Sequence, residues 1–176
     1  MESSKTTQIK IAFFSVLPPF RGGISSFSRL LVNALKGKSL IDAFTFKKQY
    51  PNFLFPGESQ FSKNKEASFP RIITSYNPFT YFNAGRKLKQ AKPDVFVANY
   101  WMPFFAPMYA FLSSRFSSSV LKVALIHNLT PHEERFFDRF LNRMFLKKFD
   151  AFVVLSEKVN QDLLSYLPDA ISKVIP

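Results

Sequence analysis

The sequence predicts an α/β fold built on a Rossmann-like, doubly wound parallel sheet. Short apolar runs rich in β-branched and aromatic residues alternate with segments in which apolar residues recur at helical spacing. The first of these runs leads into two glycines that open a helix. With 176 residues and 47% hydrophobic content, the chain suits one packed domain over residues 1–176. It contains no cysteine, which excludes a disulfide framework and a thiolate nucleophile.

The first half of the chain is predicted to hold three main strands and two helices. Gly37 after Lys36 marks the end of the first helix, and Asn77 followed by proline marks the start of the second. Residues 47–68 have no clean period and are expected to form a long excursion of unassigned role, with a short strand at Asn52–Phe55. The main elements are a strand at Ile9–Leu17, a helix at Ile24–Lys36, strands at Ile41–Phe46 and Phe69–Thr74, and a helix from Asn77 to about Gln90.

The second half continues the same alternation. Thr130-Pro-His-Glu133 is a capping box with proline at the first helical position, so a helix is expected from there to about Phe149. The expected apolar stripe consists of Phe136, Phe137, Phe140, Leu141, Met144, Phe145 and Phe149. The opposite, polar face is expected to hold Arg135, Asp138, Arg139, Asn142 and Arg143. The other expected elements are strands at Asp94–Ala98, Val120–Ile126 and Ala151–Leu155, helices from Pro103 to about Phe116 and from Ser156 to about Leu167, and the start of a strand at Lys173–Pro176.

Three loops that follow predicted strands contain unusual residues. They are Pro18–Gly23, Asn99–Pro103 and His127–His132. Because ligands of open parallel sheets bind outside the carboxyl ends of the strands, these loops are expected to converge on one cleft. Gly22-Gly23 is either a tight turn or a loop that lets backbone approach an anion at a helix start. The loop lacks both the dinucleotide fingerprint and the Walker A sequence.

Each candidate side chain in these loops has an ordinary structural alternative. His127 directly follows an apolar strand and either faces the cleft or is a hydrogen-bonded core histidine. Trp101, the only tryptophan, is either a core residue or a stacking platform for a sugar. Arg21 either meets a phosphate or is solvated, while His132 is expected to pack locally at a helix start.

The acidic residues do not suggest a glycosidase or a metal site. Asp94 and Asp150 introduce strands, and Glu133 and Glu157 lie at helix starts, so no pair of carboxylates is expected to act as acid and base. The spacing of the two histidines does not match a metal site, and no metal is expected.

The charge favours anionic partners. Lysine and arginine exceed aspartate and glutamate by 24 to 12, which gives a net charge of +12. The chain also has 23 phenylalanines, and phenylalanine beside lysine and arginine is typical of proteins that contact a membrane surface. The cations form no single run and no RNA- or DNA-binding motif is present, which argues against nucleic acid as a partner.

Five motifs in order resemble the amino-terminal domain of glycosyltransferase family 4, the retaining enzymes of the GT-B fold. They are Lys10–Ile24 with its terminal Gly-Gly-Ile, Lys92-Pro-Asp-Val95, His127–Glu133, Asp150–Glu157 and Lys173-Val-Ile-Pro176. The resemblance implies a Rossmann-like half of a two-domain enzyme that moves a sugar from a nucleotide-sugar to a saccharide or lipid-linked acceptor. It implies no cofactor besides this donor substrate.

The same resemblance assigns roles to residues of this chain. Gly22, Gly23 and Ile24 would approach the donor's diphosphate, and His127 would contact the transferring sugar or the acceptor. Arg21, Asn99, Tyr100, Trp101 and Asn128 are the candidate acceptor contacts. The nucleotide pocket and the Glu-x7-Glu motif would lie in a second, carboxyl-terminal domain that is absent from this sequence and would be supplied in cis or in trans. The isolated chain is therefore expected to have negligible transferase activity.

Two other functions stay open at the level of sequence. One is a basic Rossmann-like module that binds anionic lipid or nucleic acid without chemistry, and the other is a non-catalytic remnant. The expectation that accounts for most of the motifs is a glycosyltransferase domain in the cytoplasm. A peripheral position at the cytoplasmic face of a membrane is part of this expectation.

Overall fold

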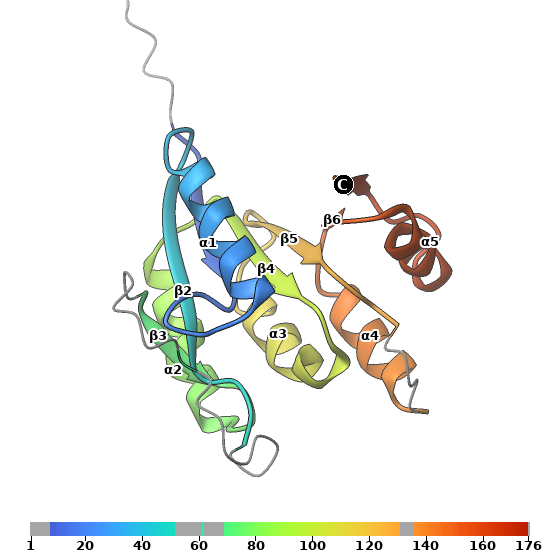
Figure 1. Cartoon of the computed structure of the whole chain (residues 1–176), viewed down its shortest axis with the longest axis horizontal. Helices are drawn as coiled ribbons and strands as arrows, with labels where there is room; N and C mark the ends of the chain where they lie inside the picture. Colours follow the sequence, from blue (N-terminus) through green and yellow to red (C-terminus); the bar gives the residue numbers. More distant parts are fainter. Residues whose placement is uncertain (1–7, 52–60, 62–68, 131–135, 176) are drawn as a thin grey trace, which may run out of the picture.

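The computed structural model describes residues 8–51, 61, 69–130 and 136–175. Within these residues, seven parallel strands form one sheet in the order β3-β2-β1-β4-β5-β6-β7 (Figure 1). The chain runs outward in one direction from β1 to β3 and in the other direction from β4 to β7, so the predicted doubly wound α/β fold is confirmed. The strands are β1 (Lys10–Phe14), β2 (Leu40–Lys48), β3 (Arg71–Thr74), β4 (Val95–Tyr100), β5 (Leu121–Ile126), β6 (Ala151–Val154) and β7 (Ser172–Val174).

Helices connect the strands and lie over the two faces of the sheet. They are α1 (Gly23–Leu35), α2 (Phe79–Gln90), the 3-10 turn η2 (Pro103–Phe105) that leads into α3 (Ala106–Ser113), α4 (Asp138–Leu146) and α5 (Glu157–Tyr166). The helix caps predicted at Asn77 and Ser156 are present, since the Asn77 side chain accepts from the Phe79 N–H and the Ser156 hydroxyl accepts from the Val159 N–H. No helix among the described residues is long and apolar enough to cross a membrane.

The two faces of the sheet are packed very differently. One large cluster of buried side chains joins the sheet to α2, α3, α4 and α5 and includes Phe14, Phe96 and Phe145. On the other face, α1 contributes Val32 to a small cluster with Phe13 and Leu17. A strand alternates its side chains between the faces, so consecutive residues of β1 and β4 supply both clusters.

Several predicted boundaries were wrong, and two of them change the site. The strand predicted at Asp94–Ala98 continues as β4 to Tyr100, paired with β5 through Asn99–Leu125 and Tyr100–Ile126, so Asn99 and Tyr100 are strand residues. The strand predicted to end at Leu17 ends at Phe14, and Ser15 begins the loop.

The helix predicted from the Thr130 capping box begins at Asp138, after a turn at Phe136–Phe137. His132 and Glu133 lie outside the described residues, as does the strand predicted at Asn52–Phe55. On the predicted polar face, Arg139 and Arg143 are exposed as expected, but Asp138 and Asn142 are buried. The predicted apolar stripe was wrong at its start, because Phe136, Phe137 and Phe140 are exposed.

Candidate functional site

The carboxyl edge of the sheet at β1 and β4 is the place where the strand order reverses. In open α/β sheets this switch point opens a crevice for ligands. Here the loop after β1 leads into α1, β4 ends at Tyr100, and β5 leads into His127. The His127 N–H donates to the Tyr100 carbonyl at 2.9 Å, which fixes the histidine beside the end of β4.

The start of α1 presents open backbone. Gly22 precedes the helix with a φ of 116° and a ψ of 166°, and no side chain caps the helix. The first intrahelical bond runs from the Ser26 N–H to the Gly22 carbonyl, so the N–H groups of Gly23, Ile24 and Ser25 come before it. A Cβ on either glycine would meet nothing within 4 Å. These donors can therefore face an anion directly.

A small cavity of about 200 Å³ lies against this helix start and has basic residues on its wall. Arg21 and Arg29 line it together with Gly22, Ser25 and Ser26. Ser25 is 2% exposed, and its hydroxyl has no hydrogen-bond partner among the described residues. An unpaired buried hydroxyl is costly, so its presence in the cavity wall indicates a place for a polar ligand or water.

His127 carries a second unpaired polar atom. Its ring packs edge-on against Phe27 of α1, with ring centroids 5.0 Å apart and an interplanar angle of 84°. Its Nε2 is buried and has no hydrogen-bond partner in the part of the chain that the structure describes. Burial lowers the pKa of His127 to about 4, so the imidazole is neutral at neutral pH and can hydrogen-bond a hydroxyl without adding charge.

Beneath the Gly22 loop, a network of polar side chains ties α1 to the sheet. The Asn99 amide donates to the Ser15 hydroxyl at 2.9 Å and to the Ser28 hydroxyl at 3.0 Å, and the two serines share a hydrogen bond of 2.7 Å. All three residues are fully buried, and Asn99 Oδ1 has no partner. Sequence reasoning missed Ser15, Ser25 and Ser28. The signal it could have used is that two of these serines lie three residues apart on one face of α1.

We call the helix start, Ser25, Asn99 and His127 the α1 site. It brings together five of the predicted residues, namely Gly22, Gly23, Ile24, Asn99 and His127, around the carboxyl end of β4, with the exposed Arg21 beside them. Asn128 is half-buried on the loop that follows His127. Asn99 lies below the helix start with its side chain fully buried, so its acceptor contact stays a prediction that this geometry does not directly support.

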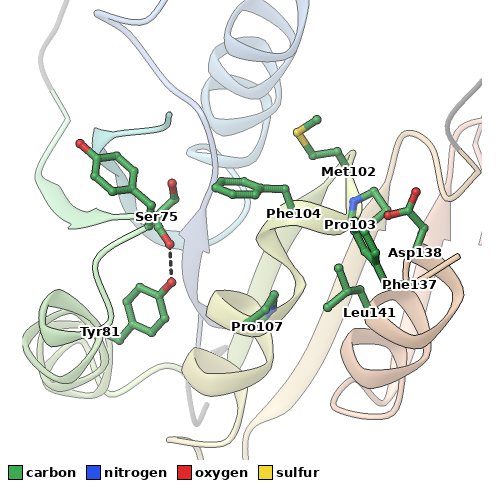
Figure 2. Close-up of a pocket in the computed structure, with 10 residues that line it drawn as sticks. Ser75, Tyr81, Met102, Pro103, Phe104, Pro107, Phe137, Asp138 and Leu141 are labelled. Carbon is green, nitrogen blue, oxygen red and sulfur yellow. Dashed lines mark hydrogen bonds between the residues drawn. The ribbon is translucent and has the colours of Figure 1, made fainter. Parts of the chain in front are cut away.

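A larger hollow of about 660 Å³ lies at the same edge on the opposite face of the sheet. Figure 2 shows its wall, which comes from the end of β3, from α2, from the segment that leads into α3, and from α4. Its lining residues are Ser75, Tyr76, Tyr81, Met102, Pro103, Phe104, Pro107, Phe137, Asp138 and Leu141. We call it the aromatic hollow.

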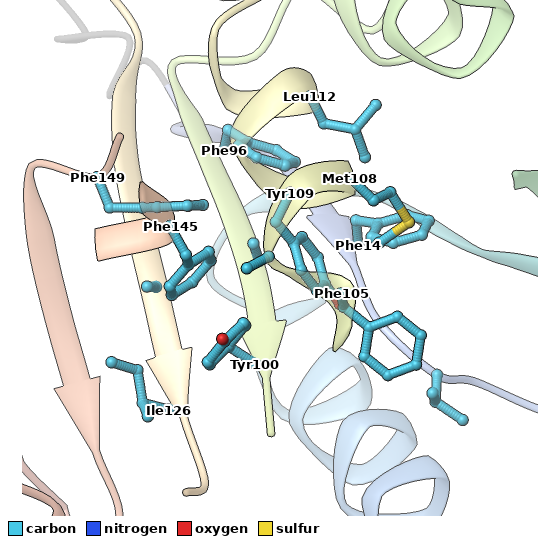
Figure 3. Close-up of a cluster of buried hydrophobic side chains, with 14 of the residues drawn as sticks. Phe14, Phe96, Tyr100, Phe105, Met108, Tyr109, Leu112, Ile126, Phe145 and Phe149 are labelled. Atoms are coloured by element: carbon cyan, nitrogen blue, oxygen red, sulfur yellow. The ribbon is translucent and has the colours of Figure 1, made fainter. Parts of the chain in front are cut away.

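Tyr100 and Trp101 belong to the packing between these two places. Tyr100 is fully buried among the rings of Figure 3, stacks on Phe145 with centroids 3.8 Å apart, and donates its hydroxyl hydrogen to Asn142 Oδ1 at 2.6 Å. Burial raises the pKa of Tyr100 well above its usual range. Trp101 is half-buried, packs against Phe105 and donates to the Tyr50 hydroxyl at 3.4 Å. The acceptor contact of the buried Tyr100 and the stacking role of Trp101 both stay predictions.

Asp94 and Asp150 lie at the opposite, amino-terminal edge of the sheet. The Asp94 carboxylate accepts from the Lys10 N–H and the Asp150 carboxylate from the Lys122 N–H, both at 2.8 Å, at the amino-terminal ends of β1 and β5. Among the residues that the structure describes, no group of three or more histidine, cysteine, aspartate or glutamate side chains is placed to hold a metal ion.

A protein-family model matches most of the chain. The model of Glycosyltransferase Family 4 matches residues 55–176, which is well over half of the chain and includes His127. A comparison with curated proteins gives no sequence match.

Solved structures share the fold at low sequence identity. An alpha-glucosyltransferase in complex with UDP has a TM-score of 0.60 and 15% identity over 96% of this chain. An alpha-glucosyltransferase in complex with UDP and a 13-mer DNA containing a HMU base has a TM-score of 0.63 and 14% identity over 93% of this chain. The chain spans 41% of the length of the first of these proteins and 42% of the second.

Proposed function

The chain belongs to glycosyltransferase family 4, and from this premise we propose that it forms the acceptor-side domain of a retaining, metal-independent glycosyltransferase. The reaction breaks the bond between the anomeric carbon of a nucleotide-sugar and its diphosphate, and forms a bond to a hydroxyl oxygen of a saccharide or lipid-linked acceptor. A second domain would hold the nucleotide, and the isolated chain would be nearly inactive. The similar alpha-glucosyltransferases are described in complex with UDP, which supports a uridine nucleotide as the first donor to try.

The observation that carries the proposal is the open start of α1 beside a neutral, unpaired histidine. When the diphosphate leaves, the N–H groups of Gly23 and Ile24 can stabilise its negative charge without a metal ion. His127 Nε2 can hydrogen-bond a hydroxyl of the transferring sugar or of the acceptor. The network of Ser15, Ser28 and Asn99 holds α1 in register with β4 and so positions these groups.

Two matched glycine variants test the proposal. Without the second domain, UDP can reach this loop only through its diphosphate and should bind weakly. At high UDP concentration we expect shifts of the backbone amide signals of Gly22 to Ser25 and of the ring signals of His127 in a ¹H–¹⁵N NMR titration of the chain. Gly22→Ala is strained, because the residue has a positive φ, and should weaken this response about tenfold. Gly23→Ala has an ordinary φ and open space around its Cβ, so it is the control for the added methyl group.

The outcome also separates the proposal from its rival. If UDP shifts signals over many basic surface residues and leaves Gly22 to Ser25 unchanged, the donor site proposed at α1 is wrong. The chain would then fit a basic binding module, an alternative that the family match does not favour.

We further propose that the enzyme works at the cytoplasmic face of a membrane. The net charge of +12 and the exposed phenylalanines support this part. Sedimentation with anionic vesicles at low salt measures it, and the absence of binding would contradict it.

A further inference from the structure

The aromatic hollow lies apart from the groups assigned to the donor and is built from different elements. Tyr76 follows β3, Met102 and Phe104 precede α3, and Leu141 lies on α4 (Figure 2). Its volume of about 660 Å³ falls within the roughly 300–1,000 Å³ of pockets that hold small ligands. The hollow is therefore large enough for a molecule of the size of a lipid chain.

The hydrogen-bonding groups of the wall are largely engaged within the protein. The Ser75 hydroxyl donates to the Gln49 carbonyl, and the Tyr81 hydroxyl donates to the Ser75 carbonyl. Burial raises the pKa of Tyr81, which keeps its hydroxyl protonated and donating. Asp138, the charged residue of the wall, is 6% exposed and occupies the first position of α4, where the helix dipole stabilises a carboxylate. The surface left for a ligand is therefore mainly apolar.

Phenylalanines beside the hollow remain in contact with solvent. Phe104 and Phe137 line the hollow and are 42% and 46% exposed, and Phe79 and Phe140 are 86% and 69% exposed. All four lie at or next to the first turns of helices that follow strands, and in a parallel sheet these turns meet at the carboxyl edge. Single exposed apolar residues are common, but a group at one edge around a hollow marks a binding surface.

The chain itself connects the hollow to the α1 site. Asn99 belongs to the network under α1, and Met102, three residues later, lines the hollow. Three residues span at most about 10 Å. A molecule with an apolar chain in the hollow could thus carry a polar head to the edge where the sugar is transferred.

We propose that the aromatic hollow binds the apolar chain of an amphiphilic acceptor, so that the acceptor of this domain is a lipid or a lipid-linked saccharide. This inference rests on the proposed function, because it assigns the head of that molecule to the α1 site. Contact with a membrane surface alone would require the exposed rings but not the hollow. A water-soluble saccharide would not bury the apolar wall of the hollow.

Binding of alkyl glucosides tests the inference without any transfer reaction. Calorimetric titration of the chain with hexyl, octyl and decyl β-D-glucoside, each below its micelle-forming concentration, should give an affinity that rises by up to about fourfold per methylene. Methyl β-D-glucoside, which lacks the chain, should not bind measurably. An affinity that does not depend on chain length would overturn the inference.

Two matched pairs of variants locate the binding. Leu141→Trp fills the hollow and should weaken octyl glucoside binding at least about tenfold, whereas Leu30→Trp, on the exposed face of α1, should leave it within about twofold. If Leu141→Trp does not fold, Phe137→Ser replaces a lining residue and Phe136→Ser replaces its neighbour, which is 98% exposed. Equal binding by both members of a folded pair would overturn the inference.

Two further readouts separate this inference from its alternatives. If the chain binds anionic vesicles but no alkyl glucoside, the phenylalanine edge contacts a membrane surface and the hollow is not a chain site. The UDP response of Gly22 to Ser25 does not involve Leu141. If the unaltered chain shows the UDP response but binds no alkyl glucoside, this inference alone is overturned. If it binds alkyl glucosides but shows no UDP response, the proposed function is overturned.

Discussion

The two faces of the sheet differ most at the carboxyl edge, where a ligand would bind. On the α1 face, the helix rests on the sheet through serines and an asparagine, and polar atoms of Ser25, Asn99 and His127 lack partners. On the opposite face, the contacts are aromatic, and the buried hydroxyls of Tyr100 and Tyr109 are hydrogen-bonded. This difference indicates that stability comes mainly from the aromatic face, while the α1 face leaves hydrogen-bonding capacity for a ligand.

The largest effect should come from removing a ring on the aromatic face. Phe145 is fully buried and stacks on Tyr100, so Phe145→Ala should lower the free energy of unfolding by about 3–5 kcal/mol. Phe140→Ala, on the same helix but 69% exposed, should change it by less than about 0.5 kcal/mol. Urea denaturation measures both. If the two variants lose similar amounts of unfolding free energy, the stacked rings contribute no more to stability than an exposed ring.

A smaller effect should come from protonation on the α1 face. The pKa of His127 is about 4 in the folded chain against an ordinary value of 6.5, so between these values the unfolded chain binds the additional proton. Stability should therefore fall as the pH drops from 6.5 to 4, by about 2 kcal/mol once partial exposure of the ring is taken into account. In His127→Gln, the denaturation profile should be flatter over this window. If the free energy of unfolding depends on pH equally in the variant and in the unaltered chain, His127 is not a buried, neutral histidine.

The smallest effect should come from the serine network. Ser28→Ala removes the acceptor of one Asn99 hydrogen bond and should cost about 1 kcal/mol of stability. Asn33→Ala, at an exposed position of the same helix that does not line the cavity, is the control and should be nearly neutral. Because Ser28 positions α1, its loss should also weaken the UDP response of the Gly22 loop. An equal UDP response in the two variants would mean that the network helps α1 to pack but does not position the Gly22 loop.

Most of the fold could be predicted because its signals are local. The apolar runs, the stop at Gly37, the cap at Ser156 and the two glycines before α1 all lie within a few residues of the element that they define. The doubly wound parallel sheet and the approximate helix positions were predicted from these signals together with the rule that parallel strands need crossover connections.

The features of the fold and the site that were not predicted depend on contacts between segments far apart in the sequence. Asparagine is a poor strand former, and the strand was therefore predicted to end at Ala98. In the structure, pairing with β5 and hydrogen bonds to serines as far as 84 residues away extend β4 through Asn99. Asn142 was assigned to a solvent-facing surface of its helix, yet it is buried because it accepts from the Tyr100 hydroxyl and donates to the Leu129 carbonyl.

The alternation of side chains along β4 has a consequence for how this chain can vary. Asn99 points toward α1 and Tyr100, the next residue, points into the aromatic cluster. Deleting one residue within β4 would turn an aromatic ring toward the serines and an amide toward the rings. The contacts on both faces of the sheet would then be lost together. Substitutions can alter one face at a time, but insertions and deletions in this strand cannot, and functional relatives of this chain should keep the length of β4 even where its sequence has diverged.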